Sequence, residues 1–238
     1  MVESFMTKEN RADFPKALIV PHAGYVYSGS TAGKGFSTIK GSKAANIVLM
    51  GPAHRVYVSG LAVPDCDQFA TPLGNIELNK EILKKILKLP YVNINIAAHK
   101  EEHCLEVQLP FLQKIFSNFK IVPILAGNIE PERIALLFEE IETDVDLIII
   151  SSDLSHYNSY ERAQEMDREV SDSIEKLQPG SIRAEQACGY KAVQGFLLYA
   201  KKRGMIPRTL SLNNSGDTAG DRSSVVGYGS FAFFTAPG

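Results

Sequence analysis

Three short apolar runs in this chain each end in a turn-forming segment that carries a histidine. The runs and their histidines are 17–20 with His22, 45–50 with His54, and 146–150 with His156. Apolar runs of this length, bounded by turn residues, are typical of buried strands. Ligands of open α/β sheets bind outside the carboxyl ends of the strands. If these three strands are neighbours in a mostly parallel sheet, we expect their polar residues to meet at one edge.

Helical patterns separate the predicted strands. They include apolar positions at helical spacing in 79–89 and 190–200, and a polar amphipathic stretch at 160–177. This alternation predicts an α/β fold of three layers, with a mostly parallel central sheet and helices on both faces. The 238 residues contain no internal repeat or linker, so we assign 1–238 to a single domain. Within it, the polar segment 1–15 is expected to be a loosely ordered leader.

Composition narrows the classes of partner and the compartment. The net charge is −2 without a long basic stretch, so no nucleic-acid partner is expected. No apolar run approaches the ~20 residues that span a bilayer, so no membrane segment is expected. The three cysteines are odd in number and far apart, and the first residues do not resemble a signal peptide. We therefore predict a reducing, cytoplasmic location.

The candidate site residues are histidines, an aspartate and a cysteine. Asp153 and His156 follow the third strand, and His103 opens a helix predicted near 101–112, which Pro110 should disturb. Imidazoles and carboxylates bind metals or move protons near neutral pH. Cys188 has two interpretations. It is either a small buried apolar residue or a thiolate whose pKa is lowered at a helix N-terminus, which beside two imidazoles would make a metal site.

Five motifs, in this order and spacing, resemble those of the Memo family. They are Pro-His-Ala-Gly-Tyr-Val-Tyr-Ser-Gly at 21–29, Gly-Pro-Ala-His at 51–54, Glu-His-Cys-Leu-Glu-Val-Gln-Leu-Pro-Phe-Leu at 102–112, Ser-Ser-Asp-Leu-Ser-His-Tyr at 151–157 and Ala-Cys-Gly at 187–189. The resemblance covers about residues 16–235. It implies a fold similar to that of the class III extradiol dioxygenases, which use non-haem iron to cleave catechol rings. Residues 1–15 lack the longer aromatic N-terminal segment that is usual in the family.

The resemblance also implies roles for individual residues. His22, His54 and Cys188 would occupy the metal-ligand positions, with cysteine where the dioxygenases have a carboxylate. Asp153 and His156 would line the same pocket, with His156 similar in place to the acid/base histidine of the dioxygenases. His103 would be a further pocket residue.

Two functions of different class follow from these expectations. In the first, the pocket is a vestigial dioxygenase site that binds a metal, a small-molecule ligand or a peptide, or serves a redox-linked function. In the second, the protein is an active non-haem metal-dependent oxidoreductase or dioxygenase acting on an aromatic or phenolic compound. Iron or copper is the expected metal, with zinc also compatible with the donors. The resemblance further implies a functional link to AMMECR-type and radical-SAM-type proteins.

Overall fold

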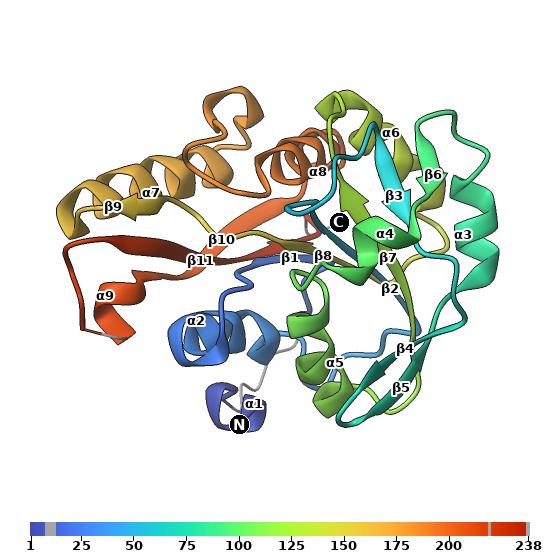
Figure 1. Ribbon diagram of the computed structural model, residues 1–238, viewed down its shortest axis with the longest axis horizontal. Coiled ribbons are helices and arrows are strands. Elements are labelled where there is room, and N and C mark those ends of the chain that lie inside the picture. Colours follow the sequence, from blue (N-terminus) through green and yellow to red (C-terminus); the bar gives the residue numbers. More distant parts are fainter. Residues whose placement is uncertain (8–12, 219, 237–238) are drawn as a thin grey trace.

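A computed structural model describes residues 1–7, 13–218 and 220–236. Its main element is a nine-stranded sheet in the order β10-β11-β1-β8-β2-β7-β3-β6, with β9 paired to β11 (Figure 1). The strands are β1 (Ala17–Val20), β2 (Asn46–Pro52), β3 (Leu61–Val63), β6 (Val92–Ile94), β7 (Lys120–Ala126), β8 (Leu147–Ser151), β9 (His156–Asn158), β10 (Ile206–Asn214) and β11 (Val225–Phe234).

The central strands β1, β8, β2 and β7 are all parallel neighbours. All five residues of β8 are buried, as expected for an apolar strand covered on both faces. The outer part of the sheet is antiparallel where β11 joins β1 and where β3 joins β7. The predicted neighbourhood of the three histidine-bearing strands is therefore confirmed for β1, β8 and β2, and a mostly parallel centre is present.

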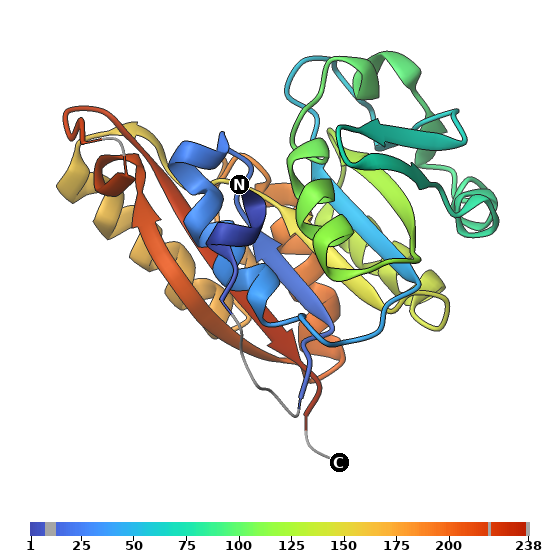
Figure 2. The same ribbon diagram turned by 90° about the horizontal axis from the view of Figure 1, so that it is seen from below.

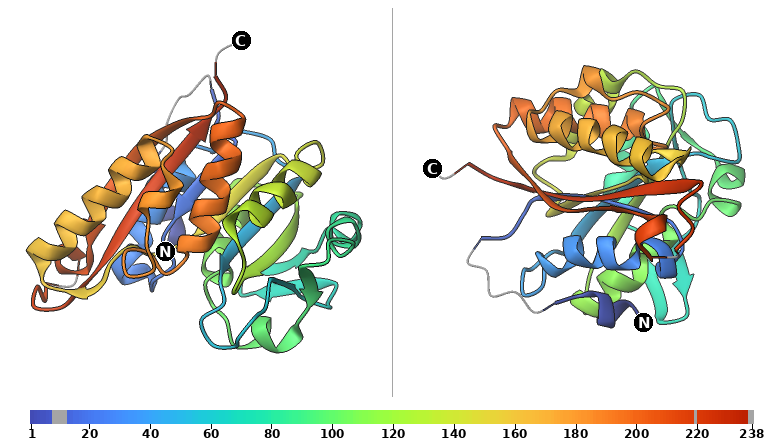
Figure 3. Two further views of the ribbon diagram at one scale, coloured as in Figure 1. Left: turned by 90° about the horizontal axis from the view of Figure 1, so that it is seen from above. Right: turned by 90° about the vertical axis from the view of Figure 1, so that its left-hand side faces the viewer.

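Helices cover both faces of the sheet and form the predicted three layers (Figure 3). One face carries α6 (Pro131–Ile141), α7 (Tyr160–Glu175) and α8 (Tyr190–Lys202), and the other carries α2 (Tyr25–Ser37) and α5 (Leu109–Ile115). The remaining short elements are α1 (Val2–Phe5), α3 (Lys80–Ile86), α4 (Ile96–Lys100), α9 (Ser215–Thr218), the 3-10 turns η1 (Glu106–Gln108) and η2 (Pro179–Ser181), and a separate hairpin of β4 (Gln68–Thr71) and β5 (Gly74–Glu77).

Two local expectations differ from the structure. The leader is not loosely held throughout, because α1 packs on α2 (Figure 2). The side chains of Val2 and Met6 are buried, and residues 8–12 lie outside the described residues. Pro110 does not interrupt a helix but lies in the first turn of α5, where its missing N–H costs no hydrogen bond. Among the described residues, no helix is both long and apolar enough to cross a membrane.

Candidate metal centre

The ends of β1, β8 and β2 bring three of the predicted polar residues to one edge of the sheet. His22 follows β1, Asp153 follows β8 and His54 follows β2. The ring centroids of His22 and His54 are 5.3 Å apart. Parallel neighbours place their carboxyl ends side by side, so the topology alone explains why these residues meet.

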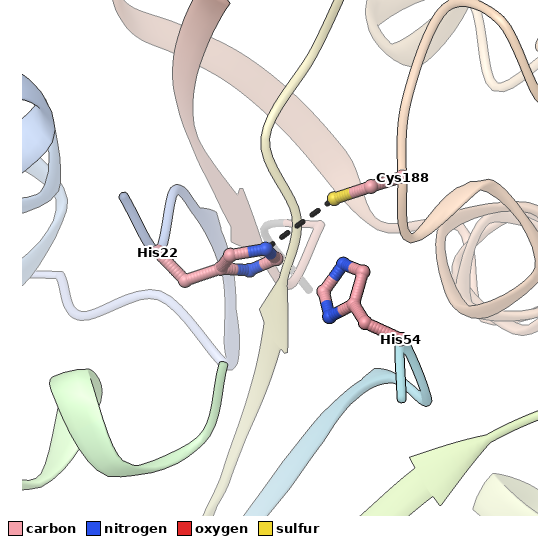
Figure 4. Close-up of side chains that lie close together, drawn as sticks. All are labelled: His22, His54 and Cys188. Atoms are coloured by element: carbon pink, nitrogen blue, oxygen red, sulfur yellow. Dashed lines mark hydrogen bonds between the residues drawn. The ribbon is translucent and has the colours of Figure 1, made fainter. Parts of the chain in front are cut away.

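Cys188 approaches this edge from the segment that leads into α8. Its Sγ lies 3.4 Å from His22 Nε2, and Figure 4 shows the thiol and both imidazoles pointing toward one another. One donor atom each of His22, His54 and Cys188 lies within 4.8 Å of the other two. Two imidazole nitrogens and a sulfur form a donor set that suits zinc, copper or iron.

The His54 ring is oriented by Glu102. The carboxylate accepts a hydrogen bond from His54 Nδ1 at 3.0 Å and another from the His54 backbone N–H at 2.7 Å. Burial opposes the charge on Glu102, but these hydrogen bonds outweigh it and lower its pKa to about 2. An ionised carboxylate only accepts, so Nδ1 of His54 carries the proton and Nε2 keeps a free lone pair. Histidine ligands of metals are commonly held in this way.

His22 is only 3% exposed. Its Nδ1 lies 3.0 Å from Ser151 Oγ, and its backbone N–H donates to Asp153 Oδ1 at 2.7 Å. Burial lowers the pKa of the His22 imidazole, more than the nearby Asp153 carboxylate raises it. The ring is therefore kept neutral, which is the form that binds metals.

The surroundings of the Cys188 thiol bear on the two interpretations of this residue. Burial, and next the negative charge of Asp153, raise its pKa to about 12, despite the backbone N–H of Asp153 that donates to Sγ at 3.3 Å. Of the two interpretations of Cys188, the buried neutral thiol is therefore favoured in the metal-free protein, because desolvation outweighs the effect of the start of α8. A metal that binds Sγ would have to displace this proton.

The segment 151–153 connects β8 to both sides of the candidate site. Ser152 Oγ accepts the backbone N–H of Gly189 at 2.9 Å, next to Cys188. A Cβ on Gly189 would lie 2.8 Å from Ser152 Cβ, so only glycine allows this approach. Residues 151–153 therefore contact both His22 and the segment of Cys188, and hold the two residues relative to each other.

The three residues predicted to be catalytic occupy different positions. His103 lies beside His22 on the solvent-exposed side of the candidate site. Its side chain is 53% exposed, and its ring centroid is 5.9 Å from that of His22. Asp153 hydrogen-bonds the backbone N–H groups of His22 and Ala23. His156, in β9, contacts the Tyr157 ring. No hydrogen bond or ring contact among the described residues joins it to Asp153 or to the His22–His54–Cys188 group, so its acid/base role stays a prediction.

A cavity of about 270 Å³ opens beside the site. It lies between the ends of β2 and β7, the loop 56–58 and the start of α8, and Cys188 forms part of its wall. Val56 and Ala126 make other parts of the wall apolar, and Lys191 lies at the start of α8. A small molecule in this cavity would reach the thiol side of the site.

Sequence reasoning missed Glu102 and Ser151, which contact the imidazoles of His54 and His22, and Gln108, which contacts Ser151. Gln108 Nε2 donates to Ser151 Oγ at 2.9 Å and to the carbonyl of Pro21 at 2.9 Å. Glu102 is adjacent to His103 in the sequence, which was a usable signal. Ser151 and Gln108 lie within the quoted motifs 151–157 and 102–112, but their contacts could not be predicted, because these depend on tertiary structure.

A second group, His54, Glu102 and Cys104, also has donor atoms within 4.8 Å. Its atoms are already paired, since Glu102 holds His54 and the Cys104 thiol donates to the carbonyl of Pro52 at 3.3 Å. Burial also raises the pKa of Cys104 well above its ordinary value. We therefore assign this group to the support of His54.

A parallel sheet edge with two oriented imidazoles and a thiol defines an α/β protein with a candidate metal centre. The chain belongs to the Memo-like protein family, whose model matches residues 1–232. It is 38% identical to a MEMO1 family protein of Sulfolobus acidocaldarius over 232 residues, covering 91% of this chain and 81% of that protein. A MEMO1 family protein of Aquifex aeolicus is 37% identical, with 90% of this chain and 84% of that protein covered.

The fold is also found in a distant solved structure. The uncharacterized protein JW3007 of Escherichia coli K12 superposes with a TM-score of 0.60 at 12% identity. The match covers 91% of this chain and 98% of that protein. At this identity the likeness concerns the α/β fold alone.

Proposed function

We propose that this protein binds a transition metal through His22 Nε2, His54 Nε2 and Cys188 Sγ. The observation that carries the proposal is the grouping of these donors within 4.8 Å, together with the hydrogen bond that occupies Nδ1 of each imidazole. Iron and copper remain our preferred metals, and zinc also suits two imidazoles and a thiolate. Bound there, such a metal would supply Lewis-acid or redox chemistry.

We favour a metal-handling or ligand-binding role for this site, with a small molecule or a peptide as the ligand. The cavity beside Cys188 supports a small-molecule ligand. A functional link to AMMECR-type and radical-SAM-type proteins, and a cytoplasmic location, remain expectations from the sequence.

A metal-dependent oxidoreductase or dioxygenase is the second candidate. It is favoured by the cavity beside Cys188. It is also favoured by the exposed imidazole of His103, whose ring centroid lies 5.9 Å from that of His22 and which could exchange a proton with a compound bound at the metal. Oxygen uptake by the metal-loaded protein with a panel of catechols and phenols would support it. His156→Ala and His103→Ala should then lose turnover while keeping the metal. A metal-loaded wild type that takes up no oxygen with any of these compounds would contradict this second candidate.

Metal content measured by mass spectrometry tests the binding site itself. The protein would be purified and reconstituted without oxygen, and wild type compared with His22→Ala and Cys188→Ala. We expect near-stoichiometric iron or copper in wild type and its loss in both variants. Cys66→Ala is the matched control, since Cys66 is a free cysteine outside the site, and it should keep the metal. Little metal in every sample would contradict the proposal.

A further inference from the structure

The hydrogen bonds around Ser151 determine which nitrogen of His22 carries the proton. Ser151 Oγ has three polar neighbours: the carbonyl oxygen of Cys104 at 2.6 Å, Gln108 Nε2 at 2.9 Å and His22 Nδ1 at 3.0 Å. A hydroxyl has one hydrogen to donate and two lone pairs that accept. Three neighbours therefore use its full capacity.

The direction of two of these bonds is fixed by chemistry. A carbonyl oxygen only accepts, so Ser151 donates its single hydrogen to Cys104. The amide of Gln108 is oriented by the Pro21 carbonyl, which also only accepts, so Nε2 rather than Oε1 faces both Pro21 and Ser151. This orientation leaves Gln108 Oε1 buried without a partner in the described structure, a cost that the two donated bonds must offset.

The direction of the remaining hydrogen bond, between His22 Nδ1 and Ser151 Oγ, is then determined. Because the Ser151 hydrogen is already used, His22 Nδ1 must donate to Ser151 Oγ and must carry the imidazole proton. The other nitrogen, Nε2, keeps its lone pair and lies 3.4 Å from Cys188 Sγ. We propose that Ser151, held by Gln108, is a positioning residue that locks His22 in the Nδ1–H tautomer and so presents Nε2 to the metal position.

This inference deepens the proposed metal centre and rests on it, but the tautomer can be measured without any metal. Long-range proton–nitrogen NMR on ¹⁵N-histidine-labelled, metal-free protein at mildly alkaline pH distinguishes a protonated from a bare ring nitrogen. The His22 signals would be assigned by their loss in His22→Ala. We expect Nδ1 of His22 to be protonated and Nε2 to be bare in wild type.

Ser151→Ala should populate the Nε2–H tautomer of His22 and weaken Zn²⁺ affinity by about 10- to 100-fold, measured by competition with a chelator. Ser151→Thr keeps the hydroxyl and should restore both readouts. Ser230→Ala is the matched control, because Ser230 is a fully buried serine whose hydroxyl has no partner in the described structure. Gln108→Leu provides a second variant, in which Ser151 is freed to rotate and the Nε2–H tautomer should also appear.

An unchanged His22 tautomer in both Ser151→Ala and Gln108→Leu would overturn the inference. An Nε2–H tautomer already present in wild type would overturn it as well. A tautomer that shifts as expected in a protein whose wild type binds no Zn²⁺, iron or copper would instead contradict the proposed metal centre, while the assignment of Ser151 would stand.

Discussion

At the scale of single residues, Glu102 shows how one buried carboxylate serves several partners. It accepts hydrogen bonds from the His54 ring and from the backbone N–H groups of His54 and His103. These interactions hold its pKa at about 2, against 4.5 for an ordinary glutamate. Such a group stabilises the fold above its unfolded pKa and loses that contribution as the pH falls through its folded pKa.

Glu102→Gln should therefore lower the free energy of unfolding of the metal-free protein by about 2–3 kcal/mol at neutral pH. The gap from wild type should shrink as the pH falls from 4.5 toward about 2, because wild type then takes up the proton as well. Urea denaturation over this range measures it. Glu106→Gln, which changes an exposed carboxylate nearby, should have little effect. A gap that does not vary with pH would refute the assignment.

At the scale of elements, α1 packs against α2 at two glycines, Gly29 and Gly33. A Cβ added to Gly33 would lie 2.6 Å from Phe5 Cβ and would overlap the Phe5 carbonyl, whereas one added to Gly29 would lie 2.6 Å from the Phe5 ring. Either change to alanine should cost about 1–3 kcal/mol from overpacking, which offsets or exceeds the ~1 kcal/mol that alanine gains over glycine in a helix.

The two glycines should respond differently to removal of the Phe5 ring. In a Phe5→Ala background, Gly29→Ala should lose most of its cost, because its obstacle is the ring. Gly33→Ala should keep its cost, because its obstacles are the backbone and Cβ of residue 5. A double-mutant cycle on urea unfolding measures both couplings, and equal couplings would contradict this packing. Metal content should not change in any of these variants.

The strands that carry the candidate site could be predicted from the sequence. The hydrogen bonds and the burial that set the protonation of its side chains could not. Apolar runs such as 147–150 are typical of buried strands, and the turn residues after two other such runs indicated where His22 and His54 would lie. The hairpin of β4 and β5 was missed because its residues are largely exposed and lack a clear apolar alternation. Ser151 contacts His22 across 129 residues of sequence, and the burial that raises the Cys188 pKa likewise exists only in the folded chain.

At the scale of the whole molecule, Asp167 is a titratable carboxyl group buried between the helical layer and the sheet. It lies on α7, is only 2% exposed, and accepts the backbone N–H of Ser155 at 3.0 Å. Its carboxylate lies against Gly227 of β11, where any Cβ would overlap it. Burial raises its pKa to about 6, although the hydrogen bond from the backbone N–H of Ser155 acts in the opposite direction. The helical layer is thus joined to the sheet by a carboxyl group that resists ionisation.

The contribution of Asp167 to stability changes with pH in the opposite direction to that of Glu102. The folded state holds the Asp167 proton up to about pH 6, while the ordinary value is 3.8, so stability is lost as the pH rises through this window. Asp167→Asn should raise the free energy of unfolding by about 1–3 kcal/mol at mildly alkaline pH, and the gain should vanish near 3.8. Urea denaturation across the window tests this, with Asp172→Asn as the exposed control on the same helix. A gain that is equal at both ends of the window would mean that Asp167 is charged, or neutral, throughout. The contact between α7 and the sheet would then not depend on a proton.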